Sequence, residues 1–394
     1  MTALILFATL RPSSDTSVYD LPALCILCGA RGASDALANV ILFVPFGALL
    51  ALAVGGRHAL RLAGAGCALS LMVESAQTMI PGRDPSIGDL LFNTLGTWLG
   101  ATLVLRAAWW VVPPPRVRGG LLAAGLAAAV VLALAAGVLF EPVGTGATYY
   151  GQWTPEQRHL ERYHGRVLEV TVGGLPVADG PISETPLVRE RLLGGEPVRV
   201  LAVAGPPVSG LASLFSVMDA NRQEILLIGP DRGGDLVVRR RLRGAELLLD
   251  GPHLRLRGAL AGFRPGDTLR VALWREPAGH CVEVNGVAEC GLGFTVGRGW
   301  SLVMFPDRLP AWAQRLLDLV WLAGIAAPAG FWAVRRGETA VAVLVVVAVL
   351  LGVPAVTELL PTPPTELAAG VAGVLAGAAV GRYARSARRV AASG

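Results

Sequence analysis

The sequence contains no lysine, and all 34 of its basic residues are arginine. Only 16% of the 394 residues are charged, whereas a soluble globular protein has about 25%. The missing charge is concentrated in stretches that each approach the ~20 residues needed to cross a hydrocarbon core. A composition with arginine and no lysine indicates a GC-rich genome, and so a bacterium. The nearly uncharged stretches are 37–55, 59–80, 88–112, 120–140, 310–334, 338–360 and 364–381.

The net charge of +5 does not form one clustered basic face. It is spread over loops that flank the apolar stretches, without the base-reading groups that a DNA-binding surface needs. We therefore expect membrane lipids as partners and no nucleic acid.

The arginines near the ends of the apolar stretches predict the orientation, because positively charged loops stay on the cytoplasmic side. Residues 3–10 are too short to cross alone, but a short first helix there gives about eight spans with both termini in the cytoplasm. The predicted parts are a helical domain at 1–140, an extracytoplasmic domain at 141–308, and C-terminal helices with a basic tail at 309–394. The flanking arginines are Arg57, Arg61, Arg116, Arg118, Arg335, Arg336, Arg382, Arg385, Arg388 and Arg389.

Cysteine is scarce, with five residues in the chain. Cys281 and Cys290 flank an Asn-Gly turn between two short β runs, which is a strong hairpin signal. A disulfide there would form only in an oxidising space. Cys25 and Cys28 form a C-x-x-C that is either an outside disulfide, two free thiols or a metal pair.

Between 145 and 305 the apolar runs become short and are bounded by Gly, Pro and Asp. Several alternate with period two, as half-buried strands do, and many short strands predict an antiparallel β-sandwich or jelly roll. The predicted strands are 166–172, 197–203, 212–218, 224–228, 235–240, 253–257, 267–274, 281–285 and 300–305.

The run DTLRVALW, followed by CVEVNGVAEC, resembles the late strand and hairpin of laminin-G-like and concanavalin A-like sandwiches. The resemblance implies a module that binds a glycan or a protein. Five aromatic residues could stack on sugars, although aromatic residues of a sandwich are more often buried. They are Tyr149, Tyr150, Trp153, Trp274 and Trp300.

Polar residues recur at fixed spacings between 35 and 100, within otherwise apolar stretches. The segments read NVILFVPFG at 39–47, ESAQ at 74–77 and RDPSIGDLLFNTLGTWLG at 83–100. Together they resemble the VanZ-like family, which is named for a teicoplanin-resistance protein. The matching residues are Asn39, Phe43, Pro45, Gly47, Glu74, Gln77, Arg83, Asp89, Asn93, Gly96 and Gly100. The resemblance implies a role in reducing susceptibility to glycopeptide drugs.

The spacing gives a physical interpretation without the family. Asp89, Asn93, Gly96 and Gly100 lie on one helical stripe, and Gly-x-x-x-Gly lets another helix approach closely. We expect that approach to bring Glu74 and Gln77 of the preceding helix against Asp89 and Asn93. Pro45 and Gly47 are further expected helix-packing residues.

The predicted topology puts this cluster in the outer leaflet, with Arg83 as the counter-ion of Glu74 and Asp89. An ionisable group in a membrane helix costs roughly 2.5–3.5 kcal/mol, so it needs a partner. Three interpretations stay open: a hydrogen-bonded knot that holds the helices together, a ligand pocket, and a catalytic site with Glu74 and Asp89 as acid and base. A metal would need a third oxygen, from Asp35 or Asp84; we expect neither a metal nor a cofactor.

Residues 357–381 faintly repeat this pattern. If Glu366 is aligned with Asp89, then Gly370, Gly373 and Gly377 take the places of Asn93, Gly96 and Gly100. Chance spacing in Gly/Ala-rich helices and a true duplication both explain the match.

The sequence thus predicts a polytopic α-helical protein of the bacterial cytoplasmic membrane with an outer sandwich. We expect it to bind a cell-wall glycan, a lipid-linked wall precursor or a glycopeptide. The alternatives are an enzyme that acts on a lipid headgroup and a structural scaffold.

Overall fold

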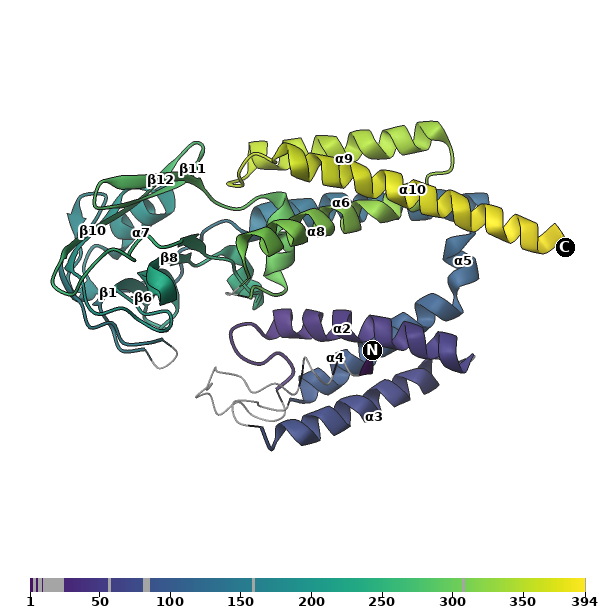
Figure 1. The fold of residues 1–394 in the computed structure, drawn as a ribbon, viewed down its shortest axis with the longest axis horizontal. Helices are drawn as coiled ribbons and strands as arrows, with labels where there is room; N and C mark the ends of the chain where they lie inside the picture. The colour runs from purple at the N-terminus through teal and green to yellow at the C-terminus, as the bar shows by residue number, and fades with distance from the viewer. Residues whose placement is uncertain are drawn as a thin grey trace.

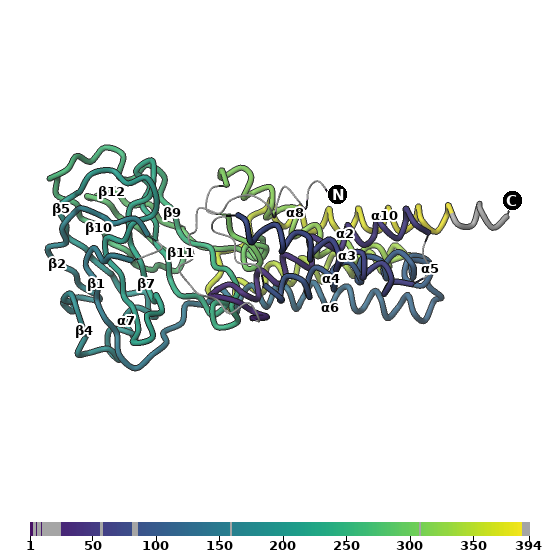
Figure 2. The backbone as a smooth tube through the Cα atoms, turned by 90° about the horizontal axis from the view of Figure 1, so that it is seen from below, coloured from purple at the N-terminus to yellow at the C-terminus, as the bar shows by residue number. Residues whose placement is uncertain are grey.

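The computed structural model is an elongated molecule in which long helices lie side by side and two β-sheets gather at one end (Figures 1 and 2). It describes residues 1–2, 5, 9, 25–55, 58–80, 86–157, 160–306 and 309–393. The expected first helix at 3–10 therefore lies almost wholly outside the described residues, as do Arg57, Arg83 and Asp84.

Six helices among the described residues are long and apolar enough to cross a membrane. A seventh long helix, α4, is not among these six; it carries Asp89 and Asn93, and it packs closely against α2 and α3. The expected total of about eight spans stays a prediction. The six are α2 (Gly32–Val54), α3 (Ala59–Gln77), α6 (Pro115–Leu139), α8 (Ala311–Trp332), α9 (Arg336–Val356) and α10 (Pro364–Ser393); α4 is Ile87–Leu105 and a short α5 (Ala107–Val111) follows it.

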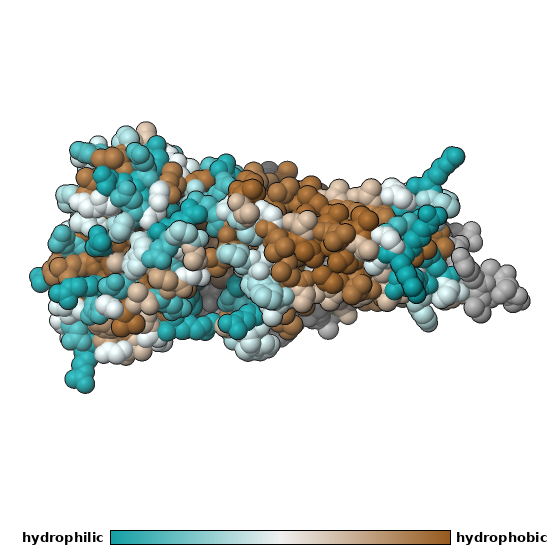
Figure 3. Space-filling view, turned by 90° about the horizontal axis from the view of Figure 1, so that it is seen from above, coloured by the Kyte–Doolittle hydropathy of each residue, from teal (hydrophilic) through white to brown (hydrophobic). Residues whose placement is uncertain are grey.

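The long helices alternate in direction. α2, α4, α8 and α10 start at the end of the molecule that carries the sheets, and α3, α6 and α9 run back toward it (Figure 1). The arginine-rich helix ends therefore lie opposite the sheets. Apolar side chains cover the helices between these two polar ends (Figure 3), as a hydrocarbon environment requires.

The β-rich part is built from two six-stranded sheets, and every strand pair is antiparallel. One sheet has the order β4-β1-β6-β7-β8-β9 and the other β12-β11-β10-β5-β2-β3. Apolar residues from both sheets form one core between them, so the predicted β-sandwich is present. The strands are β1 (Tyr149–Trp153), β2 (Arg166–Val172), β3 (Leu175–Pro176), β4 (Gly180–Ile182), β5 (Val198–Val203), β6 (Phe215–Asp219), β7 (Glu224–Asp231), β8 (Asp235–Arg240), β9 (Leu254–Leu256), β10 (Thr268–Glu276), β11 (Gly279–Val284) and β12 (Val287–Leu292).

The hairpin between β11 and β12 forms as the sequence predicts. Asn285 and Gly286 have φ of 46° and 88°, the left-handed pair that a tight hairpin turn of this hand requires. Cys281 and Cys290 form the expected disulfide across it. Cys25 and Cys28 are also joined.

The strand predicted at 300–305 is wrong, because Val296–Leu302 forms a 3-10 helix, η3. The alternating apolar pattern there has another cause: Trp300 and Leu302 are buried against the helices rather than in a sheet. The other sandwich elements are α7 (Thr185–Gly194), which the sequence did not signal, and the short 3-10 helices η1 (Arg232–Gly234) and η2 (Arg243–Leu247).

Candidate functional site

The predicted polar cluster lies at the ends of α2, α3 and α4 that face the sandwich. Ser86 caps α4, and its hydroxyl accepts from the Asp89 backbone N–H at 3.1 Å. Serine is favoured at this position because it satisfies one of the unpaired N–H groups of the first turn. The cap fixes where α4 begins, and Asp89 consequently lies in its first turn.

Two hydrogen bonds connect the acids of the cluster to other helices. Asn39 of α2 donates from Nδ2 to Asp89 Oδ1 at 2.6 Å. Glu74 of α3 accepts at Oε2 from the Ser86 backbone N–H at 3.1 Å and is only 8% exposed. Both acids take part in further interactions besides these. The cluster therefore joins three helices at one depth.

Asn93 lies one turn deeper on α4 and is 2% exposed. Its Nδ2 donates to Ser70 Oγ of α3 at 3.0 Å, while its Oδ1 has no hydrogen-bond donor among the described residues. A buried acceptor that lacks a donor is unfavourable by about 1–3 kcal/mol. Asn93 therefore has an unused acceptor inside the bundle.

The bond of Gln77 that the described residues show does not go to the acids. Its Nε2 donates to the backbone carbonyl of Thr9 at 2.9 Å. Arg83, expected to be the counter-ion, lies outside the described residues. Of the six predicted pocket residues, the described contacts link Asn39 to Asp89 and bring Glu74 to the cap of the same helix.

The glycine stripe of α4 faces a different helix from the one expected. A Cβ on Gly96 would meet the Val40 carbonyl oxygen, and a Cβ on Gly100 would overlap the Val44 carbonyl oxygen, both on α2. Gly47 of α2 is pressed against Thr97 of α4 in the same way. The close approach is thus between α2 and α4. Pro45, the other predicted helix-packing residue, lies within α2. α3 reaches α4 through polar side chains and through a different glycine, Gly66, which touches Thr97.

The sandwich is attached at this same helix end. The backbone N–H groups of Ala33 and Ser34 donate to the Leu248 carbonyl at 3.1 and 3.3 Å. Ser34 Oγ donates to the Leu302 carbonyl at 2.7 Å and accepts from the Asp250 N–H at 2.5 Å. Sequence reasoning missed Ser34 and Asp250, because partners more than 200 residues apart leave no local pattern.

A second polar cluster lies where α8 and α10 begin, and η3 covers it. Asp318 of α8 is 6% exposed and accepts from Trp300 Nε1 at 2.7 Å and from Arg298 Nη2 at 3.1 Å. Glu366 of α10 is 5% exposed and accepts from Thr295 Oγ1 at 2.7 Å and from the Gly297 N–H at 3.3 Å. Sequence reasoning missed Asp318, although a lone acid in an apolar helix is a signal for such a role.

A cavity of about 150 Å³ separates the sandwich from the loop between α9 and α10. Arg275 of β10 forms an ion pair with Glu358 of that loop. Arg240 donates to the Leu192 carbonyl at 2.8 Å and contacts His280 Nε2. Burial, followed by the charges of Arg240 and Arg275, lowers the pKa of His280 from 6.5 to about 4. His280 is therefore neutral at pH 7 and accepts from Arg240.

The sandwich aromatics divide into buried and accessible residues. Tyr149 is fully buried and Trp300 is 9% exposed, so neither is free to stack on a sugar. Trp274 lines an open hollow of about 580 Å³ on the outer face of the β2–β5–β10–β11 sheet. Glu276 lies beside Cys281 and Cys290, but the two sulfurs are bonded to each other and are not thiolate ligands.

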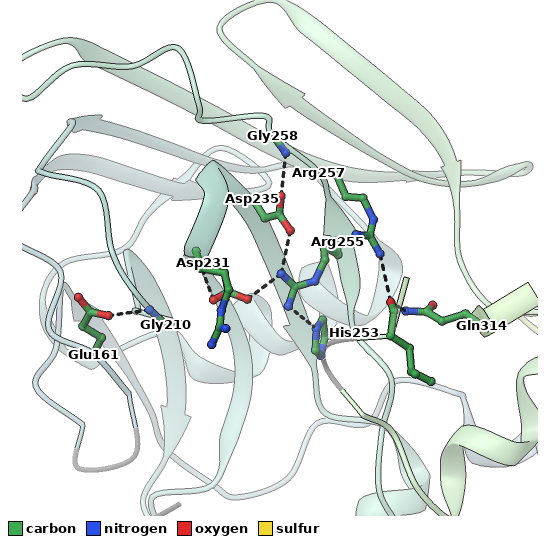
Figure 4. Close-up of polar contacts among 11 residues, drawn as sticks. Glu161, Gly210, Asp231, Asp235, His253, Arg255, Arg257, Gly258 and Gln314 are labelled. Atoms are coloured by element: carbon green, nitrogen blue, oxygen red, sulfur yellow. Dashed lines mark hydrogen bonds and ion pairs between the residues drawn. The ribbon is translucent and has the colours of Figure 1, made fainter. Parts of the chain in front are cut away.

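Arg255 lies on the face of β9 opposite the sandwich core and is held between two acids, at 2.6 Å from Asp231 and 2.9 Å from Asp235 (Figure 4). Arg257 of the sandwich and Gln314 of α8 both donate to the backbone carbonyl of Leu309. The sandwich therefore also contacts the start of α8 here. These contacts stabilise the sandwich and its junction with the helices.

Comparison with known proteins supports the resemblance found in the sequence. The VanZ/LLP1 family model matches residues 2–110. No curated protein and no solved structure matches the chain. The match spans α2, α3 and α4, and so it includes the whole described part of the first polar cluster. Residues 2–110 of this chain are therefore a VanZ/LLP1-family domain.

Proposed function

We propose that this protein binds the polar part of a cell-envelope component at the sandwich-facing ends of α2, α3 and α4. The component would be a lipid-linked wall precursor, a wall glycan or a glycopeptide drug. The observation that carries the proposal is the meeting of Asn39, Glu74 and Asp89, from three helices, at the end where the sandwich is anchored. Acids kept in membrane helices are usually functional, because insertion penalises them.

The expected orientation puts this cluster at the outer surface. Arginine-rich loops stay in the cytoplasm, and here they lie at the helix ends opposite the sandwich. The sandwich would then face the extracytoplasmic space, where its disulfide is stable. In that orientation the cluster meets envelope components and not cytosolic ones.

Two charge-removing substitutions test the proposal. We expect Glu74→Gln and Asp89→Asn each to abolish the decrease in teicoplanin susceptibility of expressing cells, at unchanged protein levels in the membrane. The control is Ser75→Ala, since Ser75 is exposed on α3 and, among the described residues, its hydroxyl bonds to the carbonyl of Leu71 one turn away.

The outcomes separate the interpretations. If both variants keep the phenotype and only lower the unfolding temperature of the purified protein, the cluster is a structural knot and the proposal fails. If cells with the wild-type protein contain a modified lipid headgroup that both variants lack, the acids act in catalysis and simple binding is refuted.

The outer face of the second sheet supports an additional glycan-binding role for the sandwich. Its open hollow combines an aromatic ring, Trp274, with arginine and acidic side chains from neighbouring strands, and aromatic rings with a few polar groups are typical of such sites. The other charged residues are Arg199, Arg270, Glu169 and Glu283. Binding of the full-length protein to a glycan array should be lost in Trp274→Ala and kept in Tyr150→Ala, which changes the other sheet. An array with no signal would contradict this role.

A further inference from the structure

The helix pair α8–α10 repeats the helix pair α2–α4 contact by contact. Gly47 is pressed against Thr97, and Gly330 is pressed against Val374 in the same way. On the second helix of each pair, Gly96 and Gly100 meet the carbonyls of α2, while Gly373 and Gly377 meet those of α8. In every case an added Cβ would strike a backbone carbonyl of the other helix.

The residue spacing is identical in the two pairs. The α2 carbonyls that meet α4 belong to Val40 and Val44, and the α8 carbonyls that meet α10 belong to Ala323 and Ala327. Val40 precedes Gly47 by the same interval as Ala323 precedes Gly330. Each first helix has its internal proline two residues before that glycine: Pro45 in α2 and Pro328 in α8. The two pairs are therefore a structural duplication, and chance spacing does not account for it.

The duplication aligns two pairs of acids. Asp35 lies twelve residues before Gly47, and Asp318 lies twelve before Gly330. Asp89 lies seven residues before Gly96, and Glu366 lies seven before Gly373. Asp35 lies one turn before Asn39, which bonds to Asp89, and residues 295–300 bond to both Asp318 and Glu366, so the two acids of each pair lie near each other. The first pair thus consists of Asp35 and Asp89, and the second of Asp318 and Glu366.

The second acid pair shows what such a pair binds, because the chain's own η3 region occupies it. Four donors reach it: an indole N–H, a guanidinium, a hydroxyl and a backbone N–H, at 2.7–3.3 Å. Gly297 lies so close to the Glu366 carboxylate that a Cβ there would be only 2.7 Å from it. The second pair is thus an acceptor site filled by an N–H-rich segment that includes a cation.

The first acid pair differs in being more accessible. Asp35 is exposed, whereas its counterpart Asp318 is 6% exposed. The first pair also has two amides, Asn39 and Asn93, where the second has Leu322 and Gly370. The Oδ1 of Asn93, buried one turn below Asp89, has no donor among the described residues. The first copy therefore carries more polar acceptor groups than the second.

We propose that Asp35 and Asp89 bind an organic cation with N–H donors, such as a primary ammonium group, as Asp318 and Glu366 bind η3. This inference rests on the proposed function and names the chemistry of its ligand. It does not require Asp89 to be free, because a carboxylate accepts several hydrogen bonds at once, as Asp318 and Glu366 each accept two. A primary ammonium could come from a lipid headgroup or from a soluble peptide.

The test compares ligands that carry N–H donors with one that has none. Binding to the full-length purified protein is measured by native mass spectrometry with short-chain phosphatidylethanolamine, with short-chain phosphatidylcholine, and with lysine amide as the soluble amine. We expect the ethanolamine lipid or lysine amide to bind about tenfold or more tightly than the choline lipid, since charge-assisted hydrogen bonds are lost on methylation. The better of the two amines identifies the source.

Matched variants locate the site. Asp35→Asn and Asp89→Asn should each weaken amine binding about tenfold or more. Asp318→Asn should leave amine binding unchanged but lower the unfolding temperature, because the Asp318 carboxylate is already bonded to η3. Equal affinity for the amine and choline ligands refutes the inference without any variant, and wild-type amine affinity in folded Asp35→Asn refutes the assigned site. If Glu74→Gln still abolishes the cellular phenotype in those cases, the proposed function stands and only the ligand chemistry is wrong.

Discussion

The substitution Gly330→Ala measures how tightly α8 packs against α10. The added Cβ would overlap the Val374 carbonyl, which is backbone and cannot turn aside, so the two helices must separate. Overpacking of this kind destabilises proteins by about 1–3 kcal/mol. We therefore expect Gly330→Ala to lower the free energy of unfolding by that amount.

The matched control lies on the same helix. No atom of the described residues lies within 4 Å of a Cβ built on Gly324, and alanine is favoured over glycine in a helix interior by up to about 1 kcal/mol. Gly324→Ala should be neutral or stabilising, so the two variants should differ by about 1–4 kcal/mol. The free energy would be measured by reversible denaturation of the purified protein in mixed detergent micelles, followed by tryptophan fluorescence.

The duplication extends this prediction to the first helix pair. Gly47→Ala should cost as much as Gly330→Ala, because Gly47 meets the Thr97 carbonyl in the same way. Gly64→Ala on α3 is the control there, since its Cβ would meet no atom within 4 Å in the part of the chain that the structure describes. Equal stability of Gly330→Ala and Gly324→Ala would refute the packing argument, and a cost at Gly330 with none at Gly47 would refute the equivalence of the two pairs.

Two further predictions concern acid stability and orientation. The pKa of His280 is lowered from 6.5 to about 4 in the folded protein. As the pH falls, the unfolded chain therefore binds a proton at His280 before the folded protein does. The contribution of neutral His280 to stability is complete above about pH 6.5 and is lost as the pH falls toward 4. His280→Gln should therefore lose less stability than the wild type between pH 7 and pH 5, by at most about 2 kcal/mol; equal losses would contradict the assigned neutral imidazole. Cysteines introduced at Gly120 and Arg336, both exposed at the end opposite the sandwich, should resist a membrane-impermeant thiol reagent on intact cells, while one at Arg232 in the sandwich should react. Labelling at Gly120 or Arg336 from outside would overturn the predicted orientation.

Much of the architecture could be predicted from local pattern. Apolar runs of membrane-spanning length gave helices close to their observed bounds, as at 310–334 for α8 and 364–381 for the start of α10. Period-two alternation gave β2 and β8 at their observed residues. These features depend on residues that are close together in the sequence, and the sequence alone therefore predicts them.

Both errors arose because a local sequence pattern does not identify the distant residues that a side chain contacts. The run at 300–305 alternates like a strand, yet Trp300 is buried because its indole N–H reaches Asp318 of α8. The glycine stripe of α4 was assigned to the wrong neighbour, since spacing identifies a face without identifying the helix that packs on it.

By itself, the sequence determined the apolar helices, the sandwich with its disulfide hairpin, the VanZ-like residues and a hint of a repeat at Glu366. Only the tertiary structure decided that the glycines of α4 meet α2, that Asp318 is the counterpart of Asp35, and that η3 fills the second acid pair. The physical reason is that helix periodicity is encoded locally. A buried carboxylate, in contrast, is satisfied by whichever donors the folded chain brings to it from distant positions.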